Sequence, residues 1–190
     1  MNIIVNADLD WGIGKNGQLL VHIKEDMQRF KQLTVGRVIV LGRKTLSTFP
    51  SGKPLPDRTN IILTHDRAFN VEGAMICHSL KELACCLEAY PSESVYVVGG
   101  SSIYQALLPF CQKAYVTRVH RRFQADSFFP NLDQHPDWTL VQKEPVIKSF
   151  SRTIHSDEPI EFQFCLYQQT DPADLIKWIR ERGEPIVNNQ

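Results

Sequence analysis

The stretch Asp10 to Thr34, DWGIGKNGQLLVHIKEDMQRFKQLT, begins as a glycine-punctuated loop and continues as an amphipathic helix. Its apolar residues recur at the spacing of one buried helical stripe, formed by Ile23, Met27, Phe30 and Leu33. Asp26 falls inside this stripe, whereas its neighbour Glu25 points to the opposite, polar face. A carboxylate on an apolar face is costly unless it is hydrogen-bonded. Asp26 is therefore either a structural acid satisfied by backbone donors or a site acid with a raised pKa that awaits a polar ligand, and the spacing favours the two equally.

The composition describes one medium-sized domain with a sizeable core. The chain has 190 residues, of which 43% are hydrophobic and 22% are charged. Lys plus Arg equals Asp plus Glu at 21 each, so no overall field would draw the chain to nucleic acid or to a membrane. No apolar run has the length of a membrane span, and the chain opens directly on a strand-like segment. We therefore expect a cytoplasmic protein without a signal peptide, and a monomer as the default state.

The cysteines and histidines predict neither disulfides nor a metal site. The five cysteines are odd in number and form no C-x-x-C pair: Cys77, Cys85, Cys86, Cys111 and Cys165. They stand mostly among apolar neighbours, which is typical of reduced core residues in a cytosolic protein. The histidines are scattered rather than clustered, so we expect no bound metal.

Strand-like and helix-like segments alternate along the chain. Buried strands are expected at residues 3–7, 38–41, 59–63, 74–77, 94–98 and 114–119. Helices are expected at 43–46, 101–108 and from Ser79, with Glu82 completing a capping box, to about residue 89. Two alternating segments, 138–143 and 160–168, resemble an antiparallel pair. The sequence predicts a single-domain α/β fold with a mainly parallel central sheet, helices on both faces and an antiparallel C-terminal edge.

After Gln169 the pattern changes to a short helix. Asp171-Pro172 is a helix start with Asp171 as N-cap, Gly183 is a helix stop, and the final EPIVNNQ resembles a frayed end. The helix is amphipathic through Leu175, Ile176, Trp178 and Ile179. We therefore predict a domain over residues 1–169 and a C-terminal helical extension over 170–190 that packs back on the domain.

Gly12, Gly14 and Gly17 spell G-x-G-x-x-G, but their surroundings do not fit a dinucleotide fingerprint. That fingerprint needs a helix opening through the third glycine and an acid at the end of the next strand. Here LLVHI follows the third glycine, and the next strand ends in the basic pair Arg43-Lys44. We interpret the segment as a mobile loop. Gly52-Lys53 is likewise no phosphate-binding loop, because a proline follows it.

Two strand-to-helix junctions are better candidates for ligand binding. At residues 42–45 (GRKT) and 99–102 (GGSS) a buried strand ends, glycine permits close backbone approach and a helix begins. Both helix N-termini would lie at the carboxyl edge of a parallel sheet, where free N–H groups attract anions. Arg43 and Lys44 add charge that suits a phosphate, although glycines can also serve only to pack helices near strands. The two junctions together with Asp26 indicate that the chain binds a nucleotide and a second small ligand.

At this point the residues resemble a family, dihydrofolate reductase. The matching motifs, in the order and spacing of that family, are Asp8-x-x-Trp11-Gly12-Ile13-Gly14, Asp26-x-x-x-Phe30, Val40-Leu41-Gly42-Arg43-Lys44-Thr45, Pro54-Leu55-Pro56-x-Arg58-x-Asn60-Ile61, Val97-Val98-Gly99-Gly100-x-x-Ile103-Tyr104, Thr117 and Asp126-x-Phe128-Phe129-Pro130. The resemblance covers residues 2 to 169, and only the tail lies outside the usual family pattern. It implies an NADPH-dependent reduction of dihydrofolate to tetrahydrofolate that supports one-carbon and thymidylate metabolism and is open to antifolate inhibitors.

The resemblance also implies a substrate site. Asp26 would hold the amino group and ring nitrogen of the pterin and assist its protonation, with Thr117 tied into the same network. Arg58 would pair with the α-carboxylate of the folate glutamate, for which a bidentate guanidinium suits the geometry. The residues implied to line the pterin and aminobenzoyl pocket are Val5, Met27, Phe30, Phe49, Leu55, Val98 and Tyr104.

The cofactor site is implied in the same way. The phosphates and the 2′-phosphoribose would be held by Arg43, Lys44, Thr45 and Thr64, and the pyrophosphate would face Gly99, Gly100, Ser101, Ser102 and Ile103, with a cis peptide between the two glycines. The opening loop, and Leu19 in particular, would close over the nicotinamide; Leu19 joins Asp26 and Thr117 as the implied catalytic set. Further implied contacts are Asn6, Ala7, Ile13, Gly14, Gly17, Gly42, Leu63, Val98, Tyr104 and Asp126.

The chain departs from the family pattern at four places. Leu20-Val21 stands where Pro-Trp is common, Lys24 where proline is common, and Leu46 where a larger aromatic is frequent. The indole of that Pro-Trp pair commonly helps to hold a water near the carboxylate. Asn6 replaces a small apolar residue beside the nicotinamide amide, a contact made mainly by the backbone, so we expect activity to be kept. The departures bear on inhibitor affinity and loop dynamics more than on the reaction.

Two other functions compete with the reductase. A reductase for a riboflavin-pathway pyrimidine would share the fold but should lack Asp26 and the P-L-P-x-R turn. A catalytically silent nucleotide-binding module should have lost Asp26 or the Gly99-Gly100 junction. The sequence retains all three features, which favours the reductase.

Overall fold

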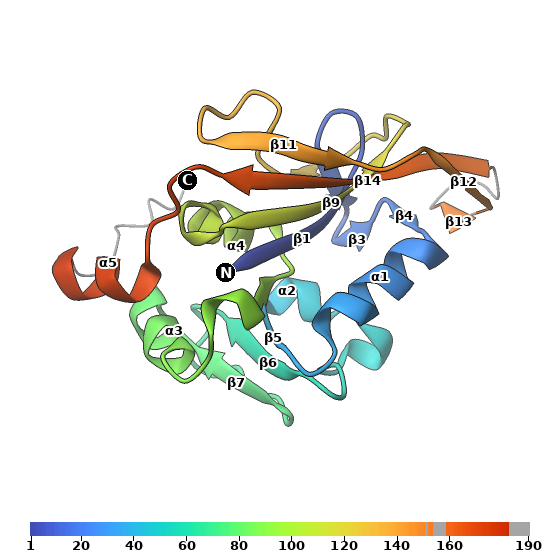
Figure 1. Cartoon of the computed structure of the whole chain (residues 1–190). Coiled ribbons are helices and arrows are strands. Elements are labelled where there is room, and N and C mark those ends of the chain that lie inside the picture. The colour runs from blue at the N-terminus through green and yellow to red at the C-terminus, as the bar shows by residue number, and fades with distance from the viewer. Residues whose placement is uncertain (151, 154–158, 183–190) are drawn as a thin grey trace.

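A mixed sheet forms the centre of the computed structural model, which describes residues 1–150, 152–153 and 159–182. Within these residues the sheet has nine strands in the order β11-β14-β9-β1-β8-β5-β6-β7, with β12 also paired to β14 (Figure 1). The strands are β1 (Asn2–Ala7), β5 (Val38–Gly42), β6 (Thr59–Leu63), β7 (Ala74–Cys77), β8 (Val95–Val97), β9 (Lys113–Val119), β11 (Trp138–Lys143), β12 (Ile147–Phe150) and β14 (Pro159–Gln169).

The sheet is parallel except at one edge. Strands β1, β5, β6, β7, β8 and β9 run parallel, whereas β14 runs antiparallel to β9, β11 and β12. Continuous apolar sequences such as VIVLG of β5 suit strands that are covered on both faces. The antiparallel pair predicted at residues 138–143 and 160–168 corresponds to β11 and β14. The predicted fold class is therefore confirmed.

Helices cover both faces because successive strand side chains point to opposite sides. The helices are α1 (Lys24–Thr34), α2 (Arg43–Leu46), α3 (Leu80–Leu87), α4 (Ser101–Leu107) and α5 (Leu175–Arg182), with short 3₁₀ turns at η1 (Pro50–Gly52), η2 (Ser92–Ser94) and η3 (Leu108–Phe110). Val40 of β5 shares a core cluster with Leu83 of α3 and Leu107 of α4. The next residue, Leu41, belongs to a second cluster that includes Phe30 of α1.

The opening loop is paired into small sheets rather than left as an open loop. Strands β2 (Gly12–Lys15), β3 (Gln18–Leu19) and β10 (Ser127–Phe128) form a three-stranded sheet, and β4 (Val21–His22) pairs with β13 (Arg152–Thr153). Asn16 and Gly17 connect β2 to β3 with φ values of 51° and 74°. A two-residue hairpin turn with two positive φ values favours Asn-Gly, and this signal explains the hairpin.

The apolar stripe of α1 differs from its prediction. Ile23 is fully buried just before the helix, and Phe30 and Leu33 are half-buried against the second core cluster, but the Met27 side chain is 46% exposed. Glu25 is half-buried instead of facing solvent freely, because its Oε2 accepts a hydrogen bond from Ser149 Oγ at 2.8 Å. The sheet therefore covers a smaller part of α1 than the spacing of the apolar residues in this helix predicted.

Helix α3 is capped almost as predicted. Ser79 Oγ accepts a hydrogen bond from the Glu82 N–H at 3.1 Å, but Glu82 Oε2 accepts from the N–H of His78, one residue before the expected donor. The helix ends at Leu87, two residues earlier than expected.

Helix α5 begins later than predicted but packs where expected. Asp174, not Asp171, caps it, with Oδ1 accepting from the Lys177 N–H at 2.8 Å. The preceding residues are held elsewhere, because the Ala173 N–H donates to the Pro109 carbonyl at 3.0 Å. Trp178 packs edge-on against Phe110, with ring centroids 5.8 Å apart, and the prediction that the helix packs on the domain is confirmed. The predicted stop at Gly183 and the frayed end lie outside the described residues.

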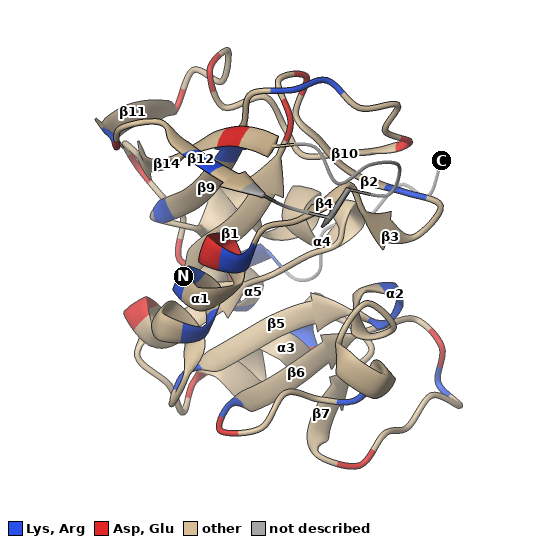
Figure 2. Ribbon diagram, turned by 90° about the vertical axis from the view of Figure 1, so that its right-hand side faces the viewer, with Lys and Arg blue, Asp and Glu red and all other residues tan. Residues whose placement is uncertain are grey.

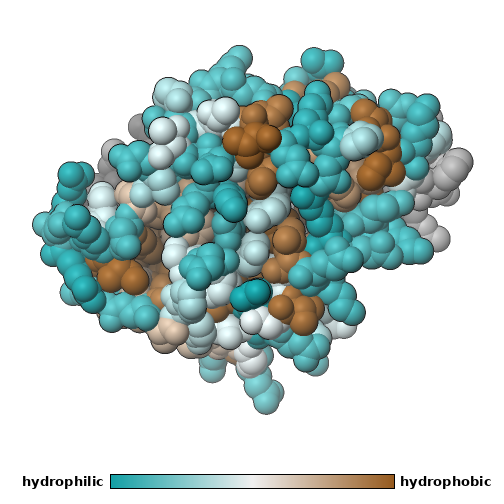
Figure 3. All heavy atoms as spheres, in the orientation of Figure 1, coloured by the Kyte–Doolittle hydropathy of each residue, from teal (hydrophilic) through white to brown (hydrophobic). Residues whose placement is uncertain are grey.

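Exposed apolar side chains are distributed in separate groups, as Figure 3 shows for one face. Three of the cysteines are buried and all five are free thiols, but Cys85 is exposed on α3, contrary to a core position. In the described part of the chain, no helix has the length and apolar character needed to cross a membrane. No group of three or more His, Cys, Asp or Glu side chains that could hold a metal ion occurs among those same residues.

Candidate active site

A cleft of about 1040 Å³ opens at the carboxyl ends of the parallel strands. This edge is where open α/β sheets bind ligands, because loops and helix N-termini converge there. Both glycine junctions contribute to its walls. The implied cofactor residues that line it are Asn6, Ile13, Gly14, Gly17, Gly42, Arg43, Lys44, Thr45, Leu63, Thr64, Val98, Gly99, Gly100, Ser101, Ser102, Ile103, Tyr104 and Asp126, and Val5 and Leu19 line it as well. Figure 2 shows the basic residues at the start of α2.

One implied cofactor residue does not line the cleft. Ala7 is fully buried in the first core cluster, so its side chain faces the core and only its main chain is free for a ligand.

Part of the cleft wall was missed by sequence reasoning. The additional lining residues are Gln18, Thr48, His65, Asp66, His78, Ser79, Leu80, Ala106 and Ser127. Three of them belong to a third strand-to-helix junction, where β7 passes into α3. This junction carries an N-cap serine but no glycine. In the expected parallel sheet the carboxyl end of residues 74–77 lies at the same edge as the two glycine junctions, and that signal could have identified it.

The two glycine junctions contact each other directly. The Gly42 N–H donates to the Gly99 carbonyl at 2.7 Å, and a Cβ on Gly42 would lie 3.0 Å from Cγ1 of Ile103. A Cβ on Gly100 would lie 3.3 Å from Oγ1 of Thr45. The Gly99–Gly100 peptide is cis, as the resemblance implied, and Gly99 has a φ of +112° that favours glycine. Backbone from both junctions therefore forms one continuous wall.

Asp26 is held by two side chains from neighbouring strands. Thr117 Oγ1 donates to Oδ1 at 2.6 Å, and Asn6 Nδ2 donates to Oδ2 at 3.1 Å. Asn6 and Thr117 stand opposite each other in the parallel register of β1 and β9. Desolvation by burial raises the pKa of Asp26, whereas these two bonds and the charge of Arg29 act to lower it. The donors to Asp26 are side chains rather than backbone groups, and the upward direction of its pKa agrees with the interpretation as a site acid.

The implied substrate residues gather near α1 and β6. Phe30, Phe49, Leu55 and Val98 pack around the second core cluster. Arg58 donates from Nε to Thr34 Oγ1 at 2.8 Å and from Nη1 to the Pro56 carbonyl at 2.6 Å. Burial lowers the pKa of Arg58, and these two bonds leave Nη2 available to a ligand. The side chain of Met27, one residue after Asp26 on α1, is exposed.

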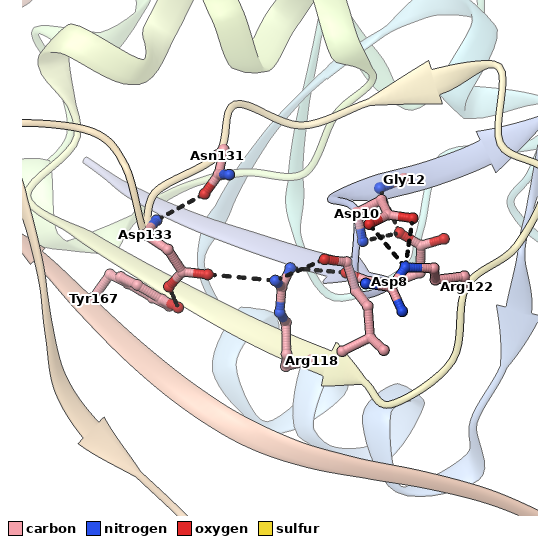
Figure 4. Close-up of polar contacts among 9 residues, drawn as sticks. Asp8, Asp10, Gly12, Arg118, Arg122, Asn131, Asp133 and Tyr167 are labelled. Atoms are coloured by element: carbon pink, nitrogen blue, oxygen red, sulfur yellow. Dashed lines mark hydrogen bonds and ion pairs between the residues drawn. The ribbon is translucent and has the colours of Figure 1, made fainter.

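A polar network fixes the root of the opening loop (Figure 4). Buried Asp8 accepts from the Gly12 N–H at 2.8 Å and from the Phe123 N–H at 2.8 Å. Arg118 Nη1 donates to the Asp8 carbonyl at 2.7 Å, and Nη2 lies 3.3 Å from Oδ2 of Asp133. Sequence reasoning missed Arg118 and Asp133, because their partners lie far away along the chain.

The tip of the same loop is fixed by Asp126. Its Oδ2 accepts from the Asn16 N–H at 2.7 Å, and its own N–H donates to the Gly14 carbonyl at 3.1 Å. These two bonds fix the loop whose Leu19 lines the cleft.

Comparison with known proteins identifies the family. The family model for dihydrofolate reductase matches residues 1–169. The chain belongs to the dihydrofolate reductase family. A dihydrofolate reductase of Staphylococcus haemolyticus is 37% identical over 171 residues, covering 89% of this chain and 95% of the relative, and one of Bacillus subtilis is 31% identical over 173 residues, covering 91% and 96%. Membership of this family makes the chain an oxidoreductase, as its motifs predicted.

A solved structure agrees with this assignment. Dihydrofolate reductase from Enterococcus faecalis, complexed with NADP(H) and RAB-propyl, superimposes with a TM-score of 0.72 at 31% identity. The match covers 90% of this chain and 96% of that protein.

Proposed function

We propose that this protein reduces 7,8-dihydrofolate to 5,6,7,8-tetrahydrofolate with NADPH. The observation that supports the proposal most strongly is Asp26, a carboxyl group with a raised pKa held beside a cleft of dinucleotide size in a dihydrofolate reductase family member. Its product would supply one-carbon and thymidylate metabolism. We propose the cytoplasm as its location, a monomer as its working state, and sensitivity to antifolates that imitate the pterin.

The residues of the cleft fit a phosphorylated dinucleotide. Glycine at positions 42 and 100 lets the two junctions lie close together along the cleft, because a Cβ there would press on Ile103 and Thr45. Exposed Arg43 and Lys44 offer two positive charges at the start of α2. We propose that the wall and these cations, called the cofactor half below, hold the pyrophosphate and the 2′-phosphate. When bound, NADPH would supply the hydride.

Asp26 would control protonation at the pterin. The ring nitrogen that must gain a proton is only weakly basic in solution, so at neutral pH it needs the field of a nearby carboxylate to take a proton from water. The ionised carboxylate would accept hydrogen bonds from the amino group and ring nitrogen, and its charge would favour a protonated ring. Thr117 orients one carboxylate oxygen through the bond to Oδ1.

Arg58 and the apolar residues would position the rest of the folate. Thr34 and Pro56 orient the guanidinium of Arg58 and leave Nη2 for the glutamate α-carboxylate. Exposed Met27 would contact the pterin, and Phe30 would lie under the aminobenzoyl group. We call Asp26, Thr117, Arg58 and these apolar side chains the acid half of the site.

The decisive assay measures NADPH oxidation with two substrates. We expect turnover with dihydrofolate and none with the riboflavin-pathway pyrimidine, with the Asp26→Asn protein as the background in both reactions. Turnover of the pyrimidine alone would refute the proposed substrate. Failure with both substrates in a folded protein that binds NADPH would favour the silent module.

A further inference from the structure

Asn6 carries a contact that the family resemblance does not account for. The resemblance implied that Asn6 contacts the nicotinamide amide mainly through its backbone. Its side-chain amide, however, donates to Oδ2 of Asp26 at 3.1 Å. Asn6 also lines the cofactor cleft, so one residue touches the acid and the cleft wall together. The adjacent Val5 and Ala7 are apolar, and only this member of the trio can donate to the acid from its side chain.

The amide supports the charged form of the acid. Thr117 supplies a hydroxyl to Oδ1 from β9, and Asn6 supplies an N–H to Oδ2 from β1, so each carboxylate oxygen has one fixed donor. The charged and titratable groups that act on this carboxyl are Arg29 of α1, which favours ionisation, and buried Tyr104 of α4, whose own pKa the acid helps to raise. A hydrogen bond to a carboxylate favours the ionised form.

We propose that Asn6 is a positioning residue for the active-site acid. Its amide fixes Oδ2 of Asp26 while Thr117 fixes Oδ1, and together they keep the carboxylate ionised and in one orientation toward the pterin. The effect on catalysis rests on the proposed function, whereas the effect on Asp26 itself does not. In this chain the asparagine side chain donates a hydrogen bond to Asp26 from a position where the family pattern has no side-chain donor.

The acid can be titrated directly in the full-length chain by NMR, with ¹³C in the aspartate carboxyl groups. The Asp26 resonance is identified by its absence from Asp26→Asn. Asn6→Leu removes the donor and keeps the branched shape with some added apolar volume, and Asn6→Ala removes the donor and admits water. We expect the pKa of Asp26 to rise in both variants, because both lose a hydrogen bond to the charged form.

The matched control is Asn2→Ala. Asn2 stands on the same strand and donates to the Glu93 carbonyl at 2.9 Å, remote from the acid, so its loss should leave the Asp26 titration unchanged. An unchanged titration in Asn6→Ala overturns the proposal. A rise in Asn6→Leu alone also overturns it, because added apolar volume would then be the cause. Should Asn6→Leu fail to fold, Asn6→Ala carries the test.

Kinetics then measure the consequence for catalysis. Because kcat/KM reports the free enzyme, Asn6→Ala should lower kcat/KM for dihydrofolate by about 10-fold in the pH range between the wild-type and variant titrations of Asp26. The loss should diminish above that range. A loss that is equal at every pH would mean that Asn6 is merely structural. The NMR titration needs no turnover, so a wild-type protein that does not reduce dihydrofolate would refute the proposed function without deciding the role of Asn6.

Discussion

The cofactor half and the acid half of the site are built from different parts of the chain. The cofactor half is mostly backbone: Gly42, Gly99 and Gly100 bring two strand-to-helix junctions together, and each junction is contiguous in sequence. The acid half is made of side chains from separate elements. Asp26 of α1 meets Thr117 of β9, whose position in the sequence is 91 residues away.

This difference determines what each half tolerates. A backbone wall depends on residues that have no side chain, whereas the acid half depends on the chemistry of single side chains. Substitution of a polar side chain should therefore cause the largest losses of activity in the acid half and smaller losses in the cofactor half. Single substitutions in each half, and loss of the extension that belongs to neither, test this contrast.

The largest effect is expected for Asp26→Asn. Asparagine keeps part of the hydrogen bonding but supplies no negative charge to favour a protonated pterin, so the hydride step should slow by about 10² to 10⁴-fold at neutral pH. The deficit should shrink at low pH, where solvent protonates the substrate. Single-turnover NADPH oxidation against pH measures it. Glu25→Gln, the adjacent carboxylate bonded to Ser149, is the matched control and should retain the wild-type rate. A wild-type rate in Asp26→Asn would refute the assignment.

The same substitution should make the fold more stable at neutral pH. The pKa of Asp26 is raised in the folded state. At pH values between the pKa of Asp26 in the unfolded chain and its pKa in the folded protein, the folded protein therefore binds more protons. The free energy of unfolding therefore falls as pH rises through that interval. Urea denaturation should show a more stable Asp26→Asn protein at pH 7 and no difference once the wild-type acid is protonated in both states. A less stable variant at pH 7 would mean that the bonds from Thr117 and Asn6 outweigh desolvation.

Arg58→Leu should produce the next largest effect. Removing one partner of a charged pair costs about 1.5–3 kcal/mol, which weakens folate binding by about 10 to 150-fold. A pteridine without the glutamate should bind as it does to the wild type, because the contact is remote from the ring. Thr34→Val removes the bond that orients Arg58, together with the bond from Thr34 Oγ1 to the Phe30 carbonyl, but keeps the guanidinium, so it should weaken folate less. Equal losses for both ligands in Arg58→Leu would show that Arg58 is structural.

The sequence allowed the fold and the cofactor half to be predicted more completely than the acid half. Apolar runs and glycines are local signals, so the junctions at residues 42–45 and 99–102 could be placed from the chain alone. The exposure of Met27 and the bond from Ser149 to Glu25 depend on distant elements, which helical periodicity does not describe. For Asn6 the resemblance implied a contact made mainly by the backbone, whereas its side chain bonds to Asp26, which comes from another element.

A smaller effect is expected for Arg43→Ala. Arg43 is exposed on the cleft wall, and a cation there would favour a 2′-phosphate over a free hydroxyl. One such exposed contact should be worth about 10-fold in the preference for NADPH over NADH, measured as the ratio of kcat/KM values. Arg67→Ala, an exposed arginine outside the cleft wall, should leave that ratio unchanged. A wild-type enzyme that uses both cofactors equally would contradict the assignment of the 2′-phosphate site.

The smallest effect on activity is expected for a chain that ends at Gln169, because the extension belongs to neither half of the site. Helix α5 buries Leu175, packs Trp178 against Phe110 and joins Arg180 to Glu88 at 2.7 Å. Its loss exposes the apolar surface of α3 and η3 on which α5 packs, so the melting temperature should fall by a few degrees. The Michaelis constants for both ligands should stay unchanged, since the described residues of α5 do not line the cleft. The Trp178→Ala variant in the full chain separates packing from chain length and should reproduce part of the loss. A truncated protein that melts like the full chain would show that the extension does not stabilise the domain, and one that folds without activity would place the extension in the reaction.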